Sequence, residues 1–120
     1  METVNILGTP YSLIVKKYDE DEEFERRGLA GYCNGCAKEI VVCDMATYKG
    51  WERESEGDVI TAQKESTRHE MVHAFLNESG LGSDTMANGD IGWAKNEEMV
   101  DWFALQGPKI YAAWKEAGAI

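Results

Sequence analysis

The sequence predicts an α+β fold in which a β-rich first half precedes a helical second half. Three observations support this division. Short β-prone runs separated by turn residues occur between residues 4 and 43. An uninterrupted helical segment follows over about residues 60–79, and an amphipathic segment follows over about residues 93–105. Since 120 residues are too few for two stable cores, we expect one domain, residues 1–120.

The chain opens with two β-prone runs, at residues 4–7 and 12–16. Residues 8–10, Gly-Thr-Pro, either turn the chain or bulge one longer strand, and the sequence leaves both readings open. The acidic run at residues 19–23 fits a solvated loop or a helix start, because its like charges would repel one another in a packed setting.

A hairpin is expected over residues 31–43. Asn34 and Gly35 tolerate the positive φ angles that a two-residue type I′ turn requires. Residues 47–58 contain two glycines and four acids and are predicted to form a connecting loop.

Each expected helix has a predicted end. Gly80 suits a left-handed C-cap for the first helix, and residues 80–92 then form a loop. The second helix presents an apolar face formed by Met99, Val100, Phe103 and Ala104. Gly107 and Pro108 are expected to break it, since proline lacks a backbone N–H, and residues 108–117 form a separate short helix.

Composition restricts the partners and the compartment. A formal net charge of −10 argues against nucleic-acid binding, which rests on lysine and arginine contacts to phosphates. No secretory signal and no membrane-spanning apolar run is visible, so we expect no membrane partner and a cytoplasmic protein. Three cysteines without an export signal fit reduced thiols better than disulfides.

The chemistry of the chain centres on His69-Glu70-Met71-Val72-His73, an H-E-x-x-H pattern formed by the only two histidines. A spacing of four places both imidazoles on one helix face, as a shared metal ion requires. Glu70 lies beside that face, where it can take a proton from a water that zinc activates.

A catalytic zinc site usually has a third protein ligand. The metzincin pattern would place a histidine at residue 79, which is serine here, so that family is excluded. Downstream, Asn96-Glu97-Glu98-Met99-Val100-Asp101 places Glu97 and Asp101 one turn apart on a common helix face.

The pair of motifs, H-E-x-x-H and N-E-x-x-x-D, resembles the gluzincin metallopeptidases, of which thermolysin is the familiar member. The resemblance implies that His69, His73 and Glu97 bind one Zn²⁺ and that Asp101 accepts a hydrogen bond from His69. In size and element order the chain is similar to the minimal ImmA/IrrE-like metallopeptidases, often carried by phages and mobile elements. That likeness implies a small antiparallel sheet packed on an active-site helix and a glutamate helix.

The activity implied by the resemblance is zinc-dependent hydrolysis of peptide bonds in a protein or peptide substrate, with Glu70 as general base and a zinc-bound water as nucleophile. Glu98 competes with Glu97 for the ligand role, because one position turns a side chain by about 100° around a helix. The spacing to Asp101 favours Glu97.

Other residues leave alternatives open. A distal histidine or tyrosine stabilises the oxyanion in gluzincins, and the candidates here are Tyr32, Tyr48 and Tyr111. The cysteines Cys33, Cys36 and Cys43 are too few for a structural zinc site of their own and are interpreted as hairpin residues without metal.

Two further functions compete with the peptidase. A hydrolase similar to peptide deformylase would take Cys43 as its third ligand. A zinc-containing binding or regulatory module would keep the site without cleaving a substrate.

Overall fold

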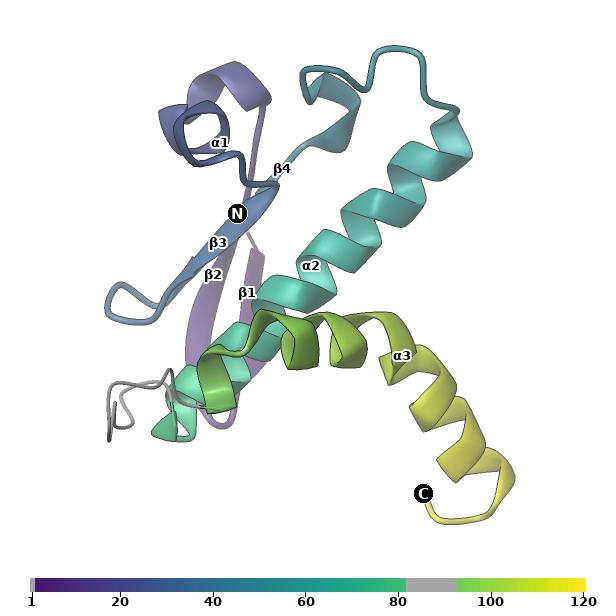
Figure 1. Cartoon of the computed structure of the whole chain (residues 1–120). Coiled ribbons are helices and arrows are strands. Elements are labelled where there is room, and N and C mark those ends of the chain that lie inside the picture. The colour runs from purple at the N-terminus through teal and green to yellow at the C-terminus, as the bar shows by residue number, and fades with distance from the viewer. Residues whose placement is uncertain (1, 82–92) are drawn as a thin grey trace.

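The computed structural model describes residues 2–81 and 93–120 and has the α+β architecture that the sequence predicts. Figure 1 shows a small sheet with the long helix α2 beside it and a second long helix, α3, crossing α2. The helices and strands, in chain order, are β1 (Glu2–Ile6), β2 (Thr9–Lys16), α1 (Glu22–Arg27), β3 (Gly31–Asn34), β4 (Glu39–Cys43), α2 (Glu56–Glu78) and α3 (Glu97–Glu116). Short 3₁₀ turns, among them Trp93–Lys95 just before α3, join several of them.

Strands β1 and β2 form a tight antiparallel hairpin in which Ile6 pairs with Thr9. The two residues between them, Leu7 and Gly8, have φ angles of 53° and 91°. Positive φ at both central positions is the signature of a type I′ turn. The Asn5 side chain accepts a hydrogen bond from the Gly8 N–H at 2.6 Å. Of the two readings that the sequence left open, the turn is therefore the one observed.

The sheet is mixed, which corrects the expectation of an antiparallel one. Its strand order is β1-β2-β4-β3, and the central pair β2–β4 is parallel while the two outer pairs are antiparallel. After β2 the chain passes through α1 and β3 before it returns as β4, so β4 runs in the same direction as β2. Strand β3 is left at an edge of the sheet.

The β3–β4 hairpin is also looser than predicted. Residues 35–38 connect the strands, and the positive φ of 59° belongs to Lys38, not to Asn34 or Gly35. Asn34 instead uses its side-chain oxygen to accept hydrogen bonds from the N–H groups of Cys36 and Ala37, at 3.1 and 3.0 Å. Such local bonding by asparagine stabilises a turn without a type I′ geometry.

The second part of the acidic run, residues 21–23, forms the start of helix α1, one of the two possibilities that the sequence allowed, while Asp19 and Glu20 lie in a 3₁₀ turn before it. Asp21 caps this helix by accepting a hydrogen bond from the Glu23 N–H at 3.0 Å. The same carboxylate accepts hydrogen bonds from Tyr32 and Lys16, so it is only 9% exposed. These contacts connect α1 to the strands on either side of it in the sequence.

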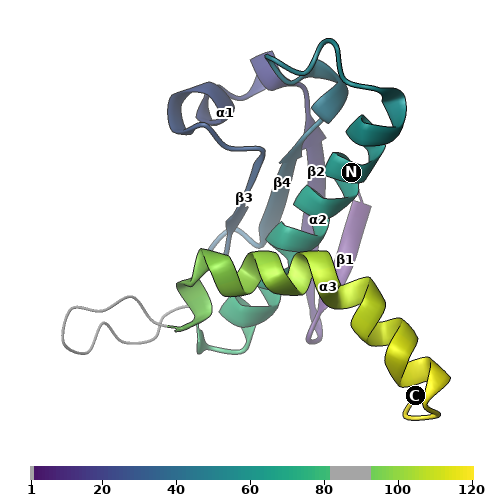
Figure 2. The same cartoon turned by 45° about the vertical axis from the view of Figure 1, so that its right-hand side comes forward.

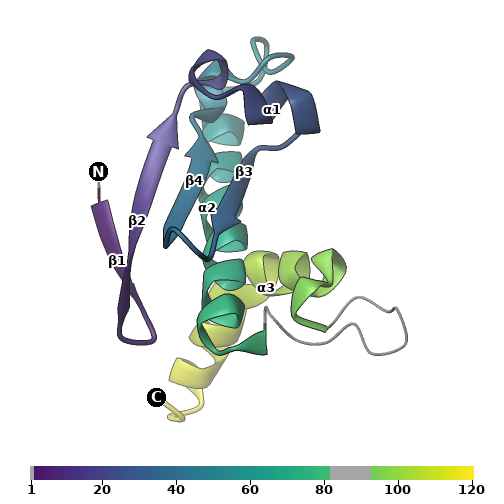
Figure 3. The ribbon, with the colours of Figure 1, turned by 90° about the vertical axis from the view of Figure 1, so that its left-hand side faces the viewer.

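Helix α2 begins at Glu56, four residues before the predicted start, because Ser55 accepts a hydrogen bond from the Asp58 N–H and caps it. It ends at Glu78, and Gly80 follows with φ of 87°, as its predicted capping role requires. Figure 3 shows α2 lying along the sheet. The contact is a buried core formed by Ile6, Tyr11, Ile40 and Ala74.

Helix α3 continues through Pro108 to Glu116, so the predicted break at Gly107-Pro108 is wrong. Proline cannot donate to the carbonyl of Ala104, four residues earlier. Arg68 of α2 donates to that carbonyl instead, at 2.6 Å, and leaves no buried acceptor unpaired. The helix bends, and its second half points away from the sheet (Figure 2). Among the described residues no helix is both long and apolar enough to cross a membrane.

Glu78, the last residue of α2, ties the helix to the sheet. Its carboxylate accepts hydrogen bonds from Lys38 at 2.9 Å, Thr9 at 2.7 Å and Tyr11 at 2.8 Å. These bonds, with the Lys38 bond as the largest cause, lower the pKa of Glu78 to about 2. Since the folded pKa lies below the unfolded value, the stabilisation is present above about pH 4.3 and is lost as the pH falls toward 2.

We predict that Glu78→Gln lowers the free energy of unfolding at pH 7, because the neutral amide loses the charge that these donors stabilise. The variant should also lose part of the wild-type decrease in stability between pH 5 and pH 3. Urea unfolding across this range measures both effects. Glu116→Gln, at an exposed position, is the matched control and should behave as wild type. Equal pH profiles for wild type and Glu78→Gln would contradict the assignment.

Candidate metal centre

Helix α2 places His69 and His73 one turn apart on the same face, as their spacing predicts. The ring centroids lie 4.9 Å apart, and the two Nε2 atoms approach to 3.2 Å. Each imidazole is 18% exposed, so the pair lies at the edge of the packed interior. Burial lowers the pKa of His73, which favours the neutral form that can bind a metal.

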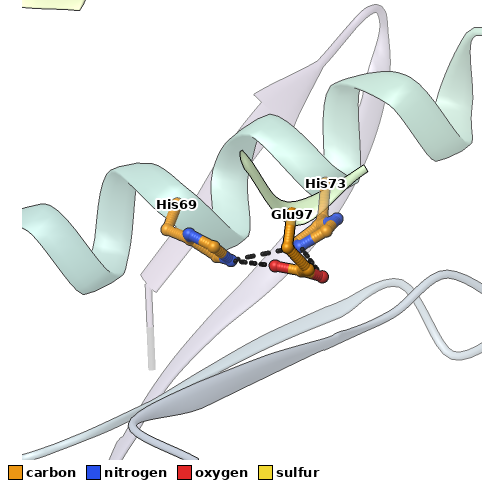
Figure 4. A group of neighbouring side chains, drawn as sticks. All are labelled: His69, His73 and Glu97. Carbon is orange, nitrogen blue, oxygen red and sulfur yellow. Dashed lines mark hydrogen bonds and ion pairs between the residues drawn. The ribbon is translucent and has the colours of Figure 1, made fainter. Parts of the chain in front are cut away.

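Glu97 supplies the third group from the start of α3. Asn96 caps this helix by accepting a hydrogen bond from the Met99 N–H, so Glu97 is its first residue. Its carboxylate oxygens lie 3.0 Å from Nε2 of His69 and 3.2 Å from Nε2 of His73. The three side chains converge on one point, with their potential ligand atoms within 4.8 Å of one another (Figure 4).

Glu98, the competing candidate, points elsewhere. Within the described residues it forms no ion pair with either histidine, and it lines a separate cavity with Trp93, Met99 and Trp102. The capped start of α3 therefore determines which of the two glutamates faces α2.

Asp101 lies one turn beyond Glu97 and contacts the other ring nitrogen of His69. Its Oδ1 atom is 2.6 Å from Nδ1. An ionised carboxylate only accepts hydrogen bonds, so Nδ1 carries the proton and donates it to Asp101. In the neutral ring the lone pair is then on Nε2, directed toward Glu97.

Glu70 is the buried acid of the site, with 7% of its surface exposed. Its Oε1 atom is 3.8 Å from Nε2 of His69. Glu70 therefore lies beside the convergent group of His69, His73 and Glu97 but is not one of its members. The pKa of Glu70 is raised to about 7, mainly by burial; the charge of His69 lowers it, and the charges of Glu97 and Asp101 raise it. Such a pKa is typical of carboxyl groups that accept and return protons near neutral pH.

Strand β3 contributes to this burial through Gly31, which the sequence analysis missed. A Cβ atom at Gly31 would lie 2.8 Å from the Val41 carbonyl oxygen and 3.1 Å from Cγ of Glu70. Only glycine allows β3 to pass so close to the acid and to its neighbouring strand.

Two cavities open on either side of His69 and Glu70. One, of about 410 Å³, is lined by the α1–β3 connection, by Glu65 and Ser66 of α2, and by Asp101 of α3. The other, of about 400 Å³, is lined by all three convergent side chains together with Arg27, Tyr32, Cys33, Asn77 and Lys95. The convergent group is therefore accessible from a cleft between β3 and the two long helices.

Of the lining residues, Asn77 had a signal in the sequence, since it follows His73 by four positions on the same helix. Lys95 also had one, because it lies two residues before Glu97. Arg27 had none, because it reaches the site from a distant part of the chain.

The three tyrosines proposed as oxyanion donors have different positions. Tyr32 lines the second cavity, but its hydroxyl donates to Asp21 at 2.6 Å, and burial raises its pKa to about 12. Tyr48 is half-buried and packs against the core beside Tyr18. Tyr111 is exposed on α3, about three turns beyond Asp101. Tyr32 is the one member of this set that lines the cleft.

The cysteines carry free thiols in three different environments. Cys33 lines the second cavity, and its pKa is raised to about 11 by burial and by Glu70. Cys36 is exposed, and Cys43 is buried against Phe24, Val41 and Met45. Within the described residues the group able to hold a metal is His69, His73 and Glu97, so Cys43 is not placed to be the third ligand.

No family model, no curated protein and no solved structure matches this chain at a significant level.

Proposed function

We propose that this chain is a zinc-dependent peptidase of the gluzincin type. The observation that carries the proposal is the convergence of His69, His73 and Glu97, with Asp101 behind His69 and the buried Glu70 beside the group. A purely structural cluster would need neither a carboxylate oriented toward two imidazole nitrogens nor a buried acid at its side.

The donor set fits zinc. Two imidazole nitrogens and one carboxylate oxygen form a common protein ligand set for catalytic Zn²⁺, and such sites keep a position for water. The hydrogen bond to Asp101 leaves Nε2 of His69 able to bind a cation, and burial favours neutral His73. When bound, zinc supplies a Lewis acid that lowers the pKa of water and polarises a carbonyl group.

Glu70 is the proposed general base and acid. A nearby cation would favour its ionised form over the neutral form that burial favours, so the carboxylate can accept a proton from the attacking water. The protonated Glu70 then donates that proton to the departing amine, which regenerates the carboxylate. Its low exposure keeps bulk water from competing for the proton.

The substrate in this proposal is an extended segment of a peptide or protein. Strand β3 lies at an edge of the sheet, so one of its sides has no partner strand within the described residues. Gly31 and Cys33 of this strand also line the cleft beside Glu70 and the histidines. A peptide that adds to this edge would pass its backbone across the site.

The wider assignment follows from the same resemblance. We propose a cytoplasmic enzyme, for which the three free thiols suit a reducing compartment. A mobile-element origin with a regulatory protein as substrate extends the ImmA/IrrE-like resemblance.

A zinc-containing binding or regulatory module without protease activity is the second candidate. One observation favours it: the hydroxyl of Tyr32, the tyrosine that lines the cleft, is already bonded to Asp21. A donor held in this way cannot stabilise an oxyanion without breaking that bond.

We predict that the purified chain holds one zinc ion and that Glu97→Ala loses it, because two imidazoles alone do not complete the site. Elemental analysis and X-ray absorption should give one zinc with nitrogen and oxygen neighbours. Glu98→Ala is the control, with the same substitution one position away, and should keep its zinc. A sulfur-rich first coordination shell, or loss of zinc from Glu98→Ala, would contradict the ligand set.

We predict that Asp101→Ala weakens zinc binding by about 10- to 100-fold, because His69 loses the hydrogen bond that orients its ring. Competition with a chromophoric chelator measures the dissociation constant. Affinity equal to that of wild type would show that the bond to Asp101 does not orient the ligand.

We predict that Glu70→Gln keeps zinc but cleaves peptides about 10²- to 10⁴-fold more slowly, because the amide cannot accept a proton. The substrate comes from a proteome-derived peptide library cleaved by wild type with zinc, with a chelator as the control. Cleavage at the wild-type rate would remove Glu70 from the mechanism. No cleavage by zinc-loaded wild type would favour the binding module.

A further inference from the structure

The cleft continues beyond the metal centre into a second, larger hollow. A cavity of about 670 Å³ lies beside the 400 Å³ cavity that contains the histidines. The two share five lining residues, namely Arg27, Tyr32, Cys33, Asn77 and Lys95. Together they form a groove that leads from Glu70 past β3 to the loop that contains Cys36.

Basic side chains line the 670 Å³ cavity of this groove, although the chain as a whole carries a net charge of −10. Arg26, Arg27 and Lys95 line it, and the acid among its lining residues is Glu23. Glu23 lies 2.6 Å from Arg26 and 3.5 Å from Arg27, so its carboxylate pairs mainly with Arg26. Lys95 has no ion pair within residues 2–81 and 93–120. Two cations therefore remain available to a ligand.

The cavity on the other side of Glu70 has acidic instead of basic lining residues. The 410 Å³ cavity on the other side of His69 and Glu70 is lined by Glu65 and Asp101 and by no lysine or arginine among the described residues. The groove therefore combines three basic side chains with the acids Glu23 and Glu97 on one side of Glu70. The cavity on the other side has acids and no lysine or arginine among its described lining residues. A ligand that crosses the site meets different charges at its two ends.

We propose that Arg27 and Lys95 form a carboxylate-binding subsite, which makes them specificity-determining residues for the peptidase proposed above, on which this inference rests. The substrate carries a carboxylate on one side of the bond to be cleaved and no acidic residue on the other. Charge-assisted hydrogen bonds from a guanidinium and an ammonium group recognise such a carboxylate. It belongs either to an internal acidic side chain or to the free C-terminus of the peptide.

The contact of Arg27 with Glu23 does not prevent this role. The Arg27 side chain is 53% exposed and 3.5 Å from a carboxylate that Arg26 already holds more closely. Exposed ion pairs of this kind contribute little, so the guanidinium can turn to a ligand. Because the subsite is open to solvent, its attraction should fall as the salt concentration rises.

Peptide binding to the full-length Glu70→Gln chain with zinc tests the subsite without relying on cleavage. The probes are heptapeptides of alanine and valine that carry a neutral dye, with one Glu, Gln or Lys residue moved along the sequence. A second set compares a free C-terminal carboxylate with an amide. Fluorescence anisotropy gives the dissociation constant of each at low and high salt.

We expect the Glu peptide, the free-acid peptide, or both to bind about tenfold more tightly than their neutral counterparts, and the Lys peptide to bind more weakly at the same position. Adding Arg27→Gln and Lys95→Gln should remove this preference, and adding Arg27→Glu and Lys95→Glu should reverse it. Adding Arg53→Gln and Lys115→Gln makes the same charge change at exposed positions outside the groove and should keep the preference. A preference for Glu peptides would show that the subsite binds an acidic side chain, and a preference for free-acid peptides would show that it binds the C-terminus.

Three results would overturn the subsite. They are equal binding of charged and neutral peptides, a preference that persists after Arg27→Gln and Lys95→Gln, and no binding at about millimolar peptide concentration. Thermal unfolding of every variant checks that the fold is intact. The outcome is separate from the test of peptidase activity, because Glu70→Gln only has to bind. A wild-type chain that cleaves peptides while Glu70→Gln shows no carboxylate preference would refute the subsite alone.

Discussion

Two hydrogen bonds hold α3 across α2, and the arrangement of the candidate metal ligands depends on them. Arg68 donates to the carbonyl of Ala104, and the adjacent residue, His69, donates to Asp101, each at 2.6 Å. The two acceptors lie about one turn apart on α3, so the bonds restrict its rotation about its own axis as well as its position. Glu97, one turn before Asp101, is thereby directed at both histidines. The ligand atoms can meet at one point only if the two helices that carry them cannot rotate independently.

The second constraint is the approach of β3 to α2. Gly31 lets the strand pass within van der Waals contact of Glu70, and the resulting loss of water raises the pKa of that acid. The same approach forms one wall of the cleft. This packing contact accounts for the burial of the acid, while the strand order of the sheet leaves the outer side of β3 at its edge.

The fold was predictable where local interactions decide it. The strand-rich half, the long helix and its end near Gly80 follow from propensity, periodicity and capping, which act over a few residues. Errors occurred where distant groups intervene. Pro108 does not end α3 because Arg68 satisfies the carbonyl that proline leaves free. The parallel pairing of β2 with β4 depends on where β3 inserts, which no local pattern encodes. The side chain of Asn34 replaced the expected turn geometry with its own hydrogen bonds.

The sequence by itself determined which residues share a helix face: His69 with His73, and Glu97 with Asp101. That information is local, because a helix repeats every 3.6 residues whatever surrounds it. Only the tertiary structure decided that the two faces meet, that Glu70 between them is buried, and that cations from α1 and from the turn before α3 reach the same groove. Distances between elements depend on how their side chains pack, and packing is a property of the whole core and not of any one segment.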